Sequence, residues 1–377
     1  MRRGRRFAIL ALGTILGAGL SVASSFAQWV PYGPGPRDQH TAVFDPATDQ
    51  MIVFGGTDLG TINYNDVWVS LNAITDTCTP TCELQWSFET PSGTAPAARS
   101  GHSAVYDSVN SRMVVFGGAK GFPSPCANDV WVLENANGAG GAPSWNELSP
   151  GGTLPSARTG HSAAYDPTTN VLIIFGGSNC NGGYLGDVWV MNNANGLGGT
   201  PKWRQLAPTG SLPPARAYAA TAYNSSSNSL VLYGGTNGTE LSDVWVLSGA
   251  NGTKKTSSWS KKSPAGTAPA ARYGAASGYD ATNDRMIVNS GFTTSGILGD
   301  TWVLENASGA GGTPTWTVLS PTHVGSQVYF QSGIYDPSSD EFVVFAGISE
   351  RAPNPTTADD HMFVLTEANG LVKANAP

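Results

Sequence analysis

Arginine and aspartate recur along this sequence at matched positions, five times each. Every recurring arginine precedes a run of small and apolar residues, and every recurring aspartate stands two residues before a tryptophan. A guanidinium fork can pair with a carboxylate through two hydrogen bonds, or it can hold an anionic ligand in a pocket. Recurrence in five places favours structural pairing, but we keep Arg99, Arg158, Arg216 and Arg272 as candidate binding residues. The full set is Arg37 with these four, and Asp66, Asp129, Asp187, Asp243 and Asp300.

Three of the five histidines share one position in this pattern. His40, His102 and His161 each lie three residues after a recurring arginine, so we interpret them as hydrogen-bonded histidines of strands. His323 and His361 are isolated. The sequence contains no zinc-ligand spacing, no glycine-rich phosphate loop before a helix and no Gly-x-Ser-x-Gly elbow. We therefore expect no metal and no cofactor, and we assign no catalytic residue.

These residues lie in a unit of about 56 to 62 residues that occurs six times. The unit is clearest between Arg99 and Trp145, where RSGHSAVYD, MVVFGG, NDVWVLENANG and a lone tryptophan follow one another. The sixth copy, with SGIYD, FVVFAG and HMFVL, is the most divergent. A repeat of this length is typical of propellers and other repeat arrays.

Each unit contains four strand-like pieces separated by turn residues. The first alternates small and larger apolar residues, the second is an apolar run that ends in Gly-Gly, the third carries Asp-Val-Trp, and the fourth begins at the lone tryptophan. Four antiparallel strands make a blade with two apolar faces, so neighbouring blades must stack into a ring. One tryptophan per unit would pack between blades: Trp68, Trp131, Trp189, Trp245 and Trp302.

The arrangement of a Gly-Gly strand, a tryptophan strand and a second spaced tryptophan resembles the kelch repeat. The resemblance covers Trp29 to Leu365, and the Arg-x-Gly-His start with Asp-Val-Trp is similar to secreted bacterial kelch proteins. It implies an all-β fold, a six-bladed β-propeller of four-stranded antiparallel blades, over residues 28–377. Some kelch propellers are copper radical oxidases, which implies two tyrosines, two histidines and a cysteine cross-linked to tyrosine. The histidines and cysteines of this chain provide no such set.

The sixth unit lacks a final tryptophan strand. The segment around Trp29 has the missing signature, a tryptophan followed by Pro and Gly and then by Arg37. We therefore predict that Trp29–Tyr32 forms the outer strand of the last blade and closes the ring.

The four cysteines predict two disulfides. Cys78 and Cys82 lie between the third and fourth strands of the first unit, whereas Cys126 and Cys180 lie between the second and third strands of neighbouring units. In a propeller these two kinds of connection lie on opposite faces, so Cys78–Cys82 with Cys126–Cys180 keeps each bond on one face. Four free thiols or a metal site are the alternatives, but the spacing of a metal site is absent.

The N-terminal residues are typical of an export signal. Arg2, Arg3, Arg5 and Arg6 precede an apolar stretch, and small residues end at Ala27, so we expect residues 1–27 to be a cleaved signal peptide. Removing these arginines changes the net charge from -7 to about -11. An acidic chain with no basic cluster apart from Lys254, Lys255, Lys261 and Lys262 argues against nucleic acid as a partner. We interpret these four lysines as charges that decorate one solvated hairpin. We expect a monomer in the periplasm, on the cell envelope or secreted, with no membrane span after cleavage.

The loops after the Gly-Gly pairs differ most between units, and variable loops on a repeated scaffold commonly carry function. We expect a binding module that uses this loop face for a protein or glycan partner. The alternatives are an enzyme resembling kelch-type sugar epimerases and a structural protein of the cell envelope, so we expect no enzyme but leave that question open. The candidate loop residues are the aromatic Tyr64, Phe122, Tyr184 and Phe292, for a glycan, and Glu240 and Glu350, for an epimerase.

Overall fold

The computed structural model describes residues 33–71, 73, 85–121, 126–254, 256–321, 327–351 and 354–371. All of them belong to one compact unit, Gly33–Pro377. Several predictions concern residues outside this described set: the signal peptide at 1–27, the closing strand at Trp29–Tyr32, the Cys78–Cys82 disulfide, Phe122, His323 and the side chain of Glu350.

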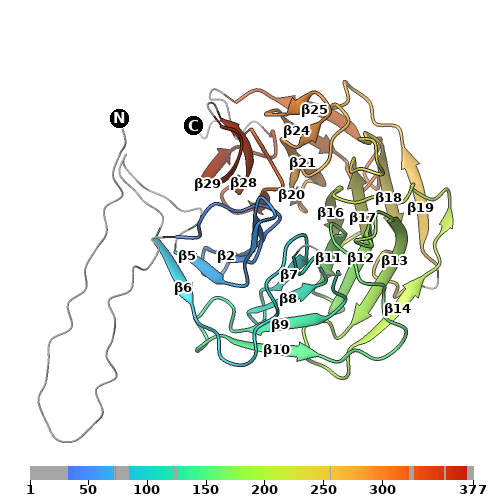
Figure 1. Cartoon of the computed structure of the whole chain (residues 1–377). Helices are drawn as coiled ribbons and strands as arrows, with labels where there is room; N and C mark the ends of the chain where they lie inside the picture. The colour runs from blue at the N-terminus through green and yellow to red at the C-terminus, as the bar shows by residue number, and fades with distance from the viewer. Residues whose placement is uncertain are drawn as a thin grey trace, which may run out of the picture. The chain divides into compact units, whose positions relative to one another are not determined.

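Six antiparallel sheets, which we call blades 1 to 6, contain almost all of the strands (Figure 1). Blade 1 consists of β1 (Thr41–Asp45), β2 (Gln50–Phe54), β5 (Val67–Leu71) and β6 (Gln85–Glu89), and blade 2 of β7 (Ser103–Asp107), β8 (Arg112–Phe116), β9 (Val130–Glu134) and β10 (Ser144–Leu148). Blade 3 consists of β11 (Ser162–Asp166), β12 (Val171–Ser178), β13 (Tyr184–Asn192) and β14 (Lys202–Leu206). Blade 4 consists of β16 (Ala220–Asn224), β17 (Ser229–Tyr233), β18 (Val244–Ser248) and β19 (Ser258–Lys262), and blade 5 of β20 (Ala276–Asp280), β21 (Arg285–Asn289), β24 (Thr301–Glu305) and β25 (Thr315–Leu319). Blade 6 consists of β26 (Val328–Tyr329), β27 (Ser332–Asp336), β28 (Glu341–Arg351) and β29 (Asn354–Thr366).

Short strands complete the structure at the ends of the blades. The pairs β3 (Thr57–Asp58) with β4 (Ile62–Asn63) and β22 (Phe292–Thr293) with β23 (Gly296–Ile297) form two small hairpins. No described residue is helical, and the described part of the chain therefore contains no helix of the length and hydropathy that a bilayer requires.

The blades form a closed ring. The innermost strands contact one another in the order β1, β7, β11, β16, β20 and β27, and β27 in turn contacts β1. The described residues thus confirm the predicted six-bladed β-propeller, and they close the ring through the innermost strands.

The core lies between the blades. Six clusters of buried apolar side chains each combine residues of two adjacent blades, one cluster for every interface. The second strand of a blade is buried on both faces, as the apolar run predicts, whereas the first strand alternates between buried and half-buried residues. Each of the five predicted tryptophans lies in one of these clusters, which confirms their packing role.

The Gly-Gly turn has the same backbone conformation in all six blades. In blade 2, Gly117 and Gly118 have φ of 69° and 94°, and a Cβ on Gly118 would lie 2.9 Å from the carbonyl oxygen of Ser100. In blades 5 and 6 the first position is occupied by Ser290 and Ala346, whose φ values of 57° and 58° are also left-handed. The loss of the first glycine therefore did not change the turn.

The connections between blades also form hydrogen bonds that the sequence did not reveal. After its outermost strand, the chain runs parallel to the outer strand of the next blade, as where β15 (Thr209–Gly210) pairs with Ser258 and Trp259. Gly151 pairs in the same way with Lys202 of blade 3. Each of these connections ties a blade to its successor at the rim.

Candidate binding face

The connections between second and third strands lie beside the segments that enter the first strands. Isolated bridges join the two kinds of segment in several blades, including Ser100 with Ala119, Ala217 with Thr236, and Tyr273 with Phe292. We call the surface that they form the loop face. The ends of the first strands and the turns after the third strands lie at the opposite end of each blade.

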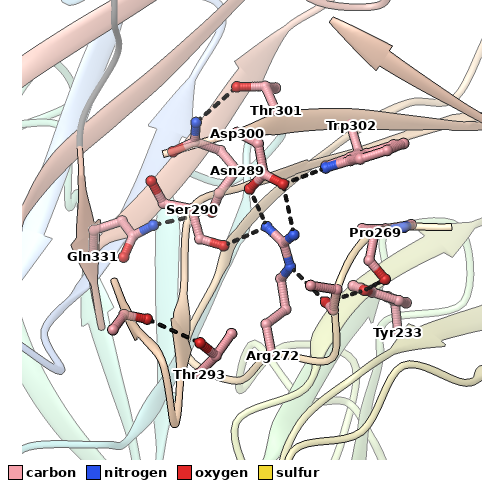
Figure 2. Close-up of polar contacts among 12 residues, drawn as sticks. Tyr233, Pro269, Arg272, Asn289, Ser290, Thr293, Asp300, Thr301, Trp302 and Gln331 are labelled. Carbon is pink, nitrogen blue, oxygen red and sulfur yellow. Dashed lines mark hydrogen bonds and ion pairs between the residues drawn. The ribbon is translucent and has the colours of Figure 1, made fainter. Parts of the chain in front are cut away.

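Each recurring arginine forms a bidentate ion pair beneath the loop face, as Figure 2 shows for blade 5. Arg272 Nη1 and Nη2 donate to the two carboxylate oxygens of Asp300 at 2.6 and 2.9 Å. The same carboxylate accepts a hydrogen bond from Trp302 Nε1 at 2.7 Å. Arg272 also donates to the carbonyl oxygens of Ser290 and Ala270. The aspartate of the Asp-Val-Trp motif therefore accepts hydrogen bonds both from the arginine guanidinium and from the indole of the tryptophan two residues later.

The same arrangement recurs in blades 1 to 4, with the pairs Arg37–Asp66, Arg99–Asp129, Arg158–Asp187 and Arg216–Asp243. The five arginine side chains are at most 1% exposed. Burial by itself would raise the pKa of Asp129, but the hydrogen bonds and the charge of Arg99 lower it to about 2. The guanidinium groups of Arg99, Arg158, Arg216 and Arg272 therefore lie inside the blades, next to protein carboxylates and carbonyls.

The three recurring histidines join adjacent blades. Nε2 of His161 in blade 3 lies 2.8 Å from Ser103 Oγ in blade 2, and Nε2 of His40 in blade 1 lies 2.8 Å from Ser332 Oγ in blade 6. Burial, followed by the positive charge of Arg158, lowers the pKa of His161 to about 3. These imidazoles are neutral at pH 7 and belong to the interfaces between blades.

A ring of backbone hydrogen bonds occupies the centre of the loop face. One residue from each blade donates its N–H to the carbonyl oxygen of its counterpart in the preceding blade, over distances of 2.7 to 3.0 Å. All six residues have positive φ, between 51° and 63°. They are Gln39, Gly101, Gly160, Tyr218, Gly274 and Phe330. A ligand on this face must therefore lie against the side chains that surround the ring.

Aromatic side chains surround this ring on the side of blades 4 to 6. We call the group Tyr218, Tyr273, Phe292, Tyr329 and Phe330 the aromatic surface; all five residues are partly exposed. Ring centroids lie 4.7 Å apart for Tyr218 and Phe330, and 4.9 Å apart for Phe292 and Tyr329. The glycines of the ring make room for them, because a Cβ on Gly274 would lie 2.8 Å from the Phe330 ring.

Polar groups lie on the other side of the ring. Gln39 accepts a hydrogen bond from the Tyr218 hydroxyl at 3.2 Å and donates one to Asp38 at 3.2 Å. Burial raises the pKa of Asp38 to about 6. The loop face therefore combines an aromatic half with the amide of Gln39, which rests on the buried carboxyl group of Asp38.

The predicted loop residues lie at different places on this face. Phe292 is part of the aromatic surface, and Tyr184 is 36% exposed. Burial raises the pKa of Tyr273, and the charge of Glu240 raises it further. Glu240 bridges to Thr236, which in turn bridges to Ala217, the residue before Tyr218. Tyr64 lies apart in blade 1, where the Arg37 guanidinium is 4.7 Å from its ring centroid.

Sequence reasoning missed Tyr218, Tyr273, Tyr329 and Phe330. Tyr218 and Tyr273 lie within two residues of the recurring arginine of their units, where the better-matched units have Ser-Gly or Thr-Gly. Phe330 lies in the divergent sixth unit. The departure of RAY and RYG from the Arg-x-Gly-His start is the signal that would have found the first two.

The Cys126–Cys180 disulfide is present, as predicted. It joins the second-to-third-strand loops of blades 2 and 3 on the loop face, with a distance of 5.7 Å between the Cα atoms. These two loops are therefore held together covalently.

Comparisons with known proteins agree with this architecture. The KLHDC2/KLHL20/DRC7 Kelch-repeats domain matches residues 70–254. Host cell factor 1 of Homo sapiens is 28% identical over 256 residues, which are 64% of this chain and 11% of that protein. F-box/kelch-repeat protein At1g51550 of Arabidopsis thaliana is 29% identical over 219 residues, which are 57% of this chain and 42% of that protein.

These curated relatives are much longer than the matched region, since the chain spans only 11% and 42% of their lengths. Among solved structures, that of YjhT superposes with a TM-score of 0.60 at 14% identity, over 89% of this chain and 99% of that one. At this identity the agreement concerns the fold. The six blades, their Gly-Gly turns and the matching repeat domain lead to one conclusion: the chain is a kelch-repeat β-propeller.

Proposed function

We propose that this protein is an exported binding module that holds a protein or glycan partner on the loop face. The observation that carries the proposal is the aromatic surface, where side chains of three consecutive blades meet while remaining partly exposed. A soluble protein rarely leaves such a group of large rings at its surface unless another molecule covers it.

The chemistry of the aromatic surface suits both kinds of partner. Tyrosine and phenylalanine offer rigid contact area at a small entropic cost, and tyrosine adds a hydroxyl group that can donate or accept. The partly exposed amide of Gln39 lies next to Tyr218 and supplies a further polar group. A sugar ring would stack its C–H face on the aromatic rings, whereas a protein would insert an apolar side chain between them.

Export is part of the proposal. The predicted signal peptide at residues 1–27 would direct the chain out of the cytoplasm, to the periplasm, the cell envelope or the medium. The Cys126–Cys180 disulfide supports this location, because structural disulfides persist in oxidising compartments.

Binding experiments with one variant pair test the proposal. The protein would be screened on a glycan array and used as bait against envelope and secreted proteins. We expect Tyr273→Ala with Tyr329→Ala to weaken a detected interaction at least tenfold, because central aromatic contacts dominate interfaces. Phe88→Ala is the matched control, since Phe88 is 48% exposed on β6 at the rim. Equal binding by both variants, or no partner in either screen, would contradict the proposal.

A further inference from the structure

The exposed positive charge of this acidic protein gathers on the outer part of blades 3 and 4. Between Asp187 and Asp280 the sequence contains only two carboxylates, Glu240 and Asp243. Asp243 is paired with Arg216, and Glu240 lies on the loop face, where it bridges to Thr236. The same stretch contains the surface cations Lys202, Arg204, Lys254, Lys261 and Lys262. Among the described residues, no ion pair involves any of these five side chains.

The sign of the charge changes around the rim. The outer strands β6 and β10 carry Glu89 and Glu147, whereas β14 carries Lys202 and Arg204. Charged residues on an outer strand prevent edge-to-edge pairing of sheets whatever their sign. Protection of the edge therefore does not explain why blades 3 and 4 have cations and no exposed carboxylate among the described residues of their outer strands.

A groove lies at the same place. It has a volume of about 630 Å³ between the sheet of blade 3 and the turn after β18 in blade 4, and it is lined by Lys202 and Arg204. Thr153, Asn192, Gln205 and Thr253 add hydroxyl and amide groups to its wall. Arg204 Nη2 donates to the carbonyl oxygen of Gly252 at 2.8 Å, which holds the guanidinium at the edge of the groove. A guanidinium has five N–H donors, so this bond leaves most of its donors for a ligand.

An equivalent groove in another blade provides an internal comparison. A space of about 520 Å³ lies between the sheet of blade 1 and the turn after β9 in blade 2. Its wall contains Glu89, Gln50 and Asn137 but no lysine or arginine. The repeat therefore builds grooves of similar size between blades, and the side chains of β14 make one of them cationic.

We propose that the groove between blades 3 and 4, the basic groove, binds an acidic polysaccharide. The cations of β14 would pair with carboxylate or sulfate groups, and the amide and hydroxyl groups of the wall would bond to the sugar hydroxyls. Lys254, next to Thr253 in the same turn, and Lys261, whose Nζ is 5.9 Å from the Trp245 ring centroid, extend the charge beyond the groove. An elongated polyanion matches this distribution. The turn of blade 4 that lines the groove follows a third strand, so this site is at the opposite end of the blades from the aromatic surface.

The test uses the full chain and three probes. A polygalacturonate oligosaccharide, a neutral maltooligosaccharide of the same length and vesicles of phosphatidylglycerol with phosphatidylcholine would be titrated at low and high NaCl. We expect binding of the acidic oligosaccharide alone, with an affinity that falls as salt screens the charges. Backbone hydrogen exchange should slow at residues 202–206 and 251–253 when this probe is bound.

Two variants locate the site. Lys202→Gln with Arg204→Gln should weaken polygalacturonate binding roughly tenfold, because two solvent-exposed charge contacts are removed. Glu89→Gln, in the equivalent groove of blade 1, should leave the affinity within about twofold of the wild type. Lys202 and Arg204 are exposed and Glu89 is half-buried, and the melting temperature verifies the fold of both variants. The proposal is wrong if the acidic oligosaccharide does not bind, if the lysine–arginine variant binds it equally well, or if only the vesicles bind.

Discussion

Replacing Asp129 by asparagine tests whether the buried ion pairs stabilise the blades. Arg99 has an exposed fraction of 0% and donates to Asp129 through Nη1 at 2.7 Å and Nη2 at 2.9 Å. Asparagine keeps the size of the side chain but leaves the guanidinium of Arg99 buried without an opposite charge. Breaking a buried pair in this way costs about 3 to 5 kcal/mol. We expect about 3 kcal/mol, because Asp129 retains an exposed fraction of 18% and is only partly desolvated.

The same strand supplies the control. Glu134, at the other end of β9, pairs with Arg112 over 3.0 Å, and the two side chains are 32% and 16% exposed. Glu134→Gln should cost at most about 1 kcal/mol, because both side chains of this pair are only half-buried and keep contact with water. In a thermal unfolding scan by circular dichroism or calorimetry, Asp129→Asn should lower the melting temperature by roughly 6 °C and Glu134→Gln by roughly 2 °C or less. Equal melting temperatures for the two variants would refute the assignment of the arginine–aspartate pairs as structural elements.

Three further perturbations test other parts of the structure. Burial lowers the pKa of His161 from 6.5 to about 3, so between these pH values the unfolded chain binds a proton that the folded chain does not. The free energy of unfolding should therefore fall by about 1.4 kcal/mol for each pH unit of acidification in this range. Urea titrations at several pH values should show a shallower fall for His161→Asn than for the wild type. Gly152→Ala should destabilise the protein by about 2 kcal/mol or more, because φ is +84° and a Cβ would lie 2.4 Å from the carbonyl oxygen of Trp203. Gly151→Ala is the control, since a Cβ there meets open space. Equal chemical denaturation midpoints for the two variants would contradict this prediction. Replacing Cys126 and Cys180 by serine should remove roughly 4 kcal/mol, the loop-closure contribution for a separation of 54 residues. A reducing agent should lower the melting temperature of the wild type by more than that of this variant, which keeps only Cys78 and Cys82.

The scaffold followed from the sequence because each of its features is local and repeated. An apolar run ending in Gly-Gly identifies the second strand, and Asp-Val-Trp identifies the third. The recurrence of Arg99 and Asp129 in other units predicted a pairing, although their separation of about 30 residues did not show which carboxylate each arginine contacts. Cys126 and Cys180 were paired correctly because strand alternation assigns both loops to one face.

The candidate sites followed from the sequence only in part. Phe292 was found because it lies in a variable loop, but Tyr218 and Phe330 lie in the segments that enter the first strands, which the better-matched units fill with Gly-His. The basic groove was overlooked for a different reason. The lysines at 254, 261 and 262 looked like the decoration of a single hairpin, and nothing local connects them to Lys202 and Arg204.

The sequence by itself determined the strands, the blade and the number of blades, because short-range periodicity specifies each strand and two apolar faces per blade require a neighbour on each side. Only the tertiary structure decided which side chains of different blades meet. Closing the ring brings Gln39 of blade 1 to Tyr218 of blade 4 and Phe330 of blade 6, across separations that carry no sequence signal. The backbone ring at the centre of the loop face and the aromatic surface around it result from that closure, whereas the basic groove results from the packing of the adjacent blades 3 and 4. The repeats build the propeller, and the residues in which the repeats differ give it its binding surfaces.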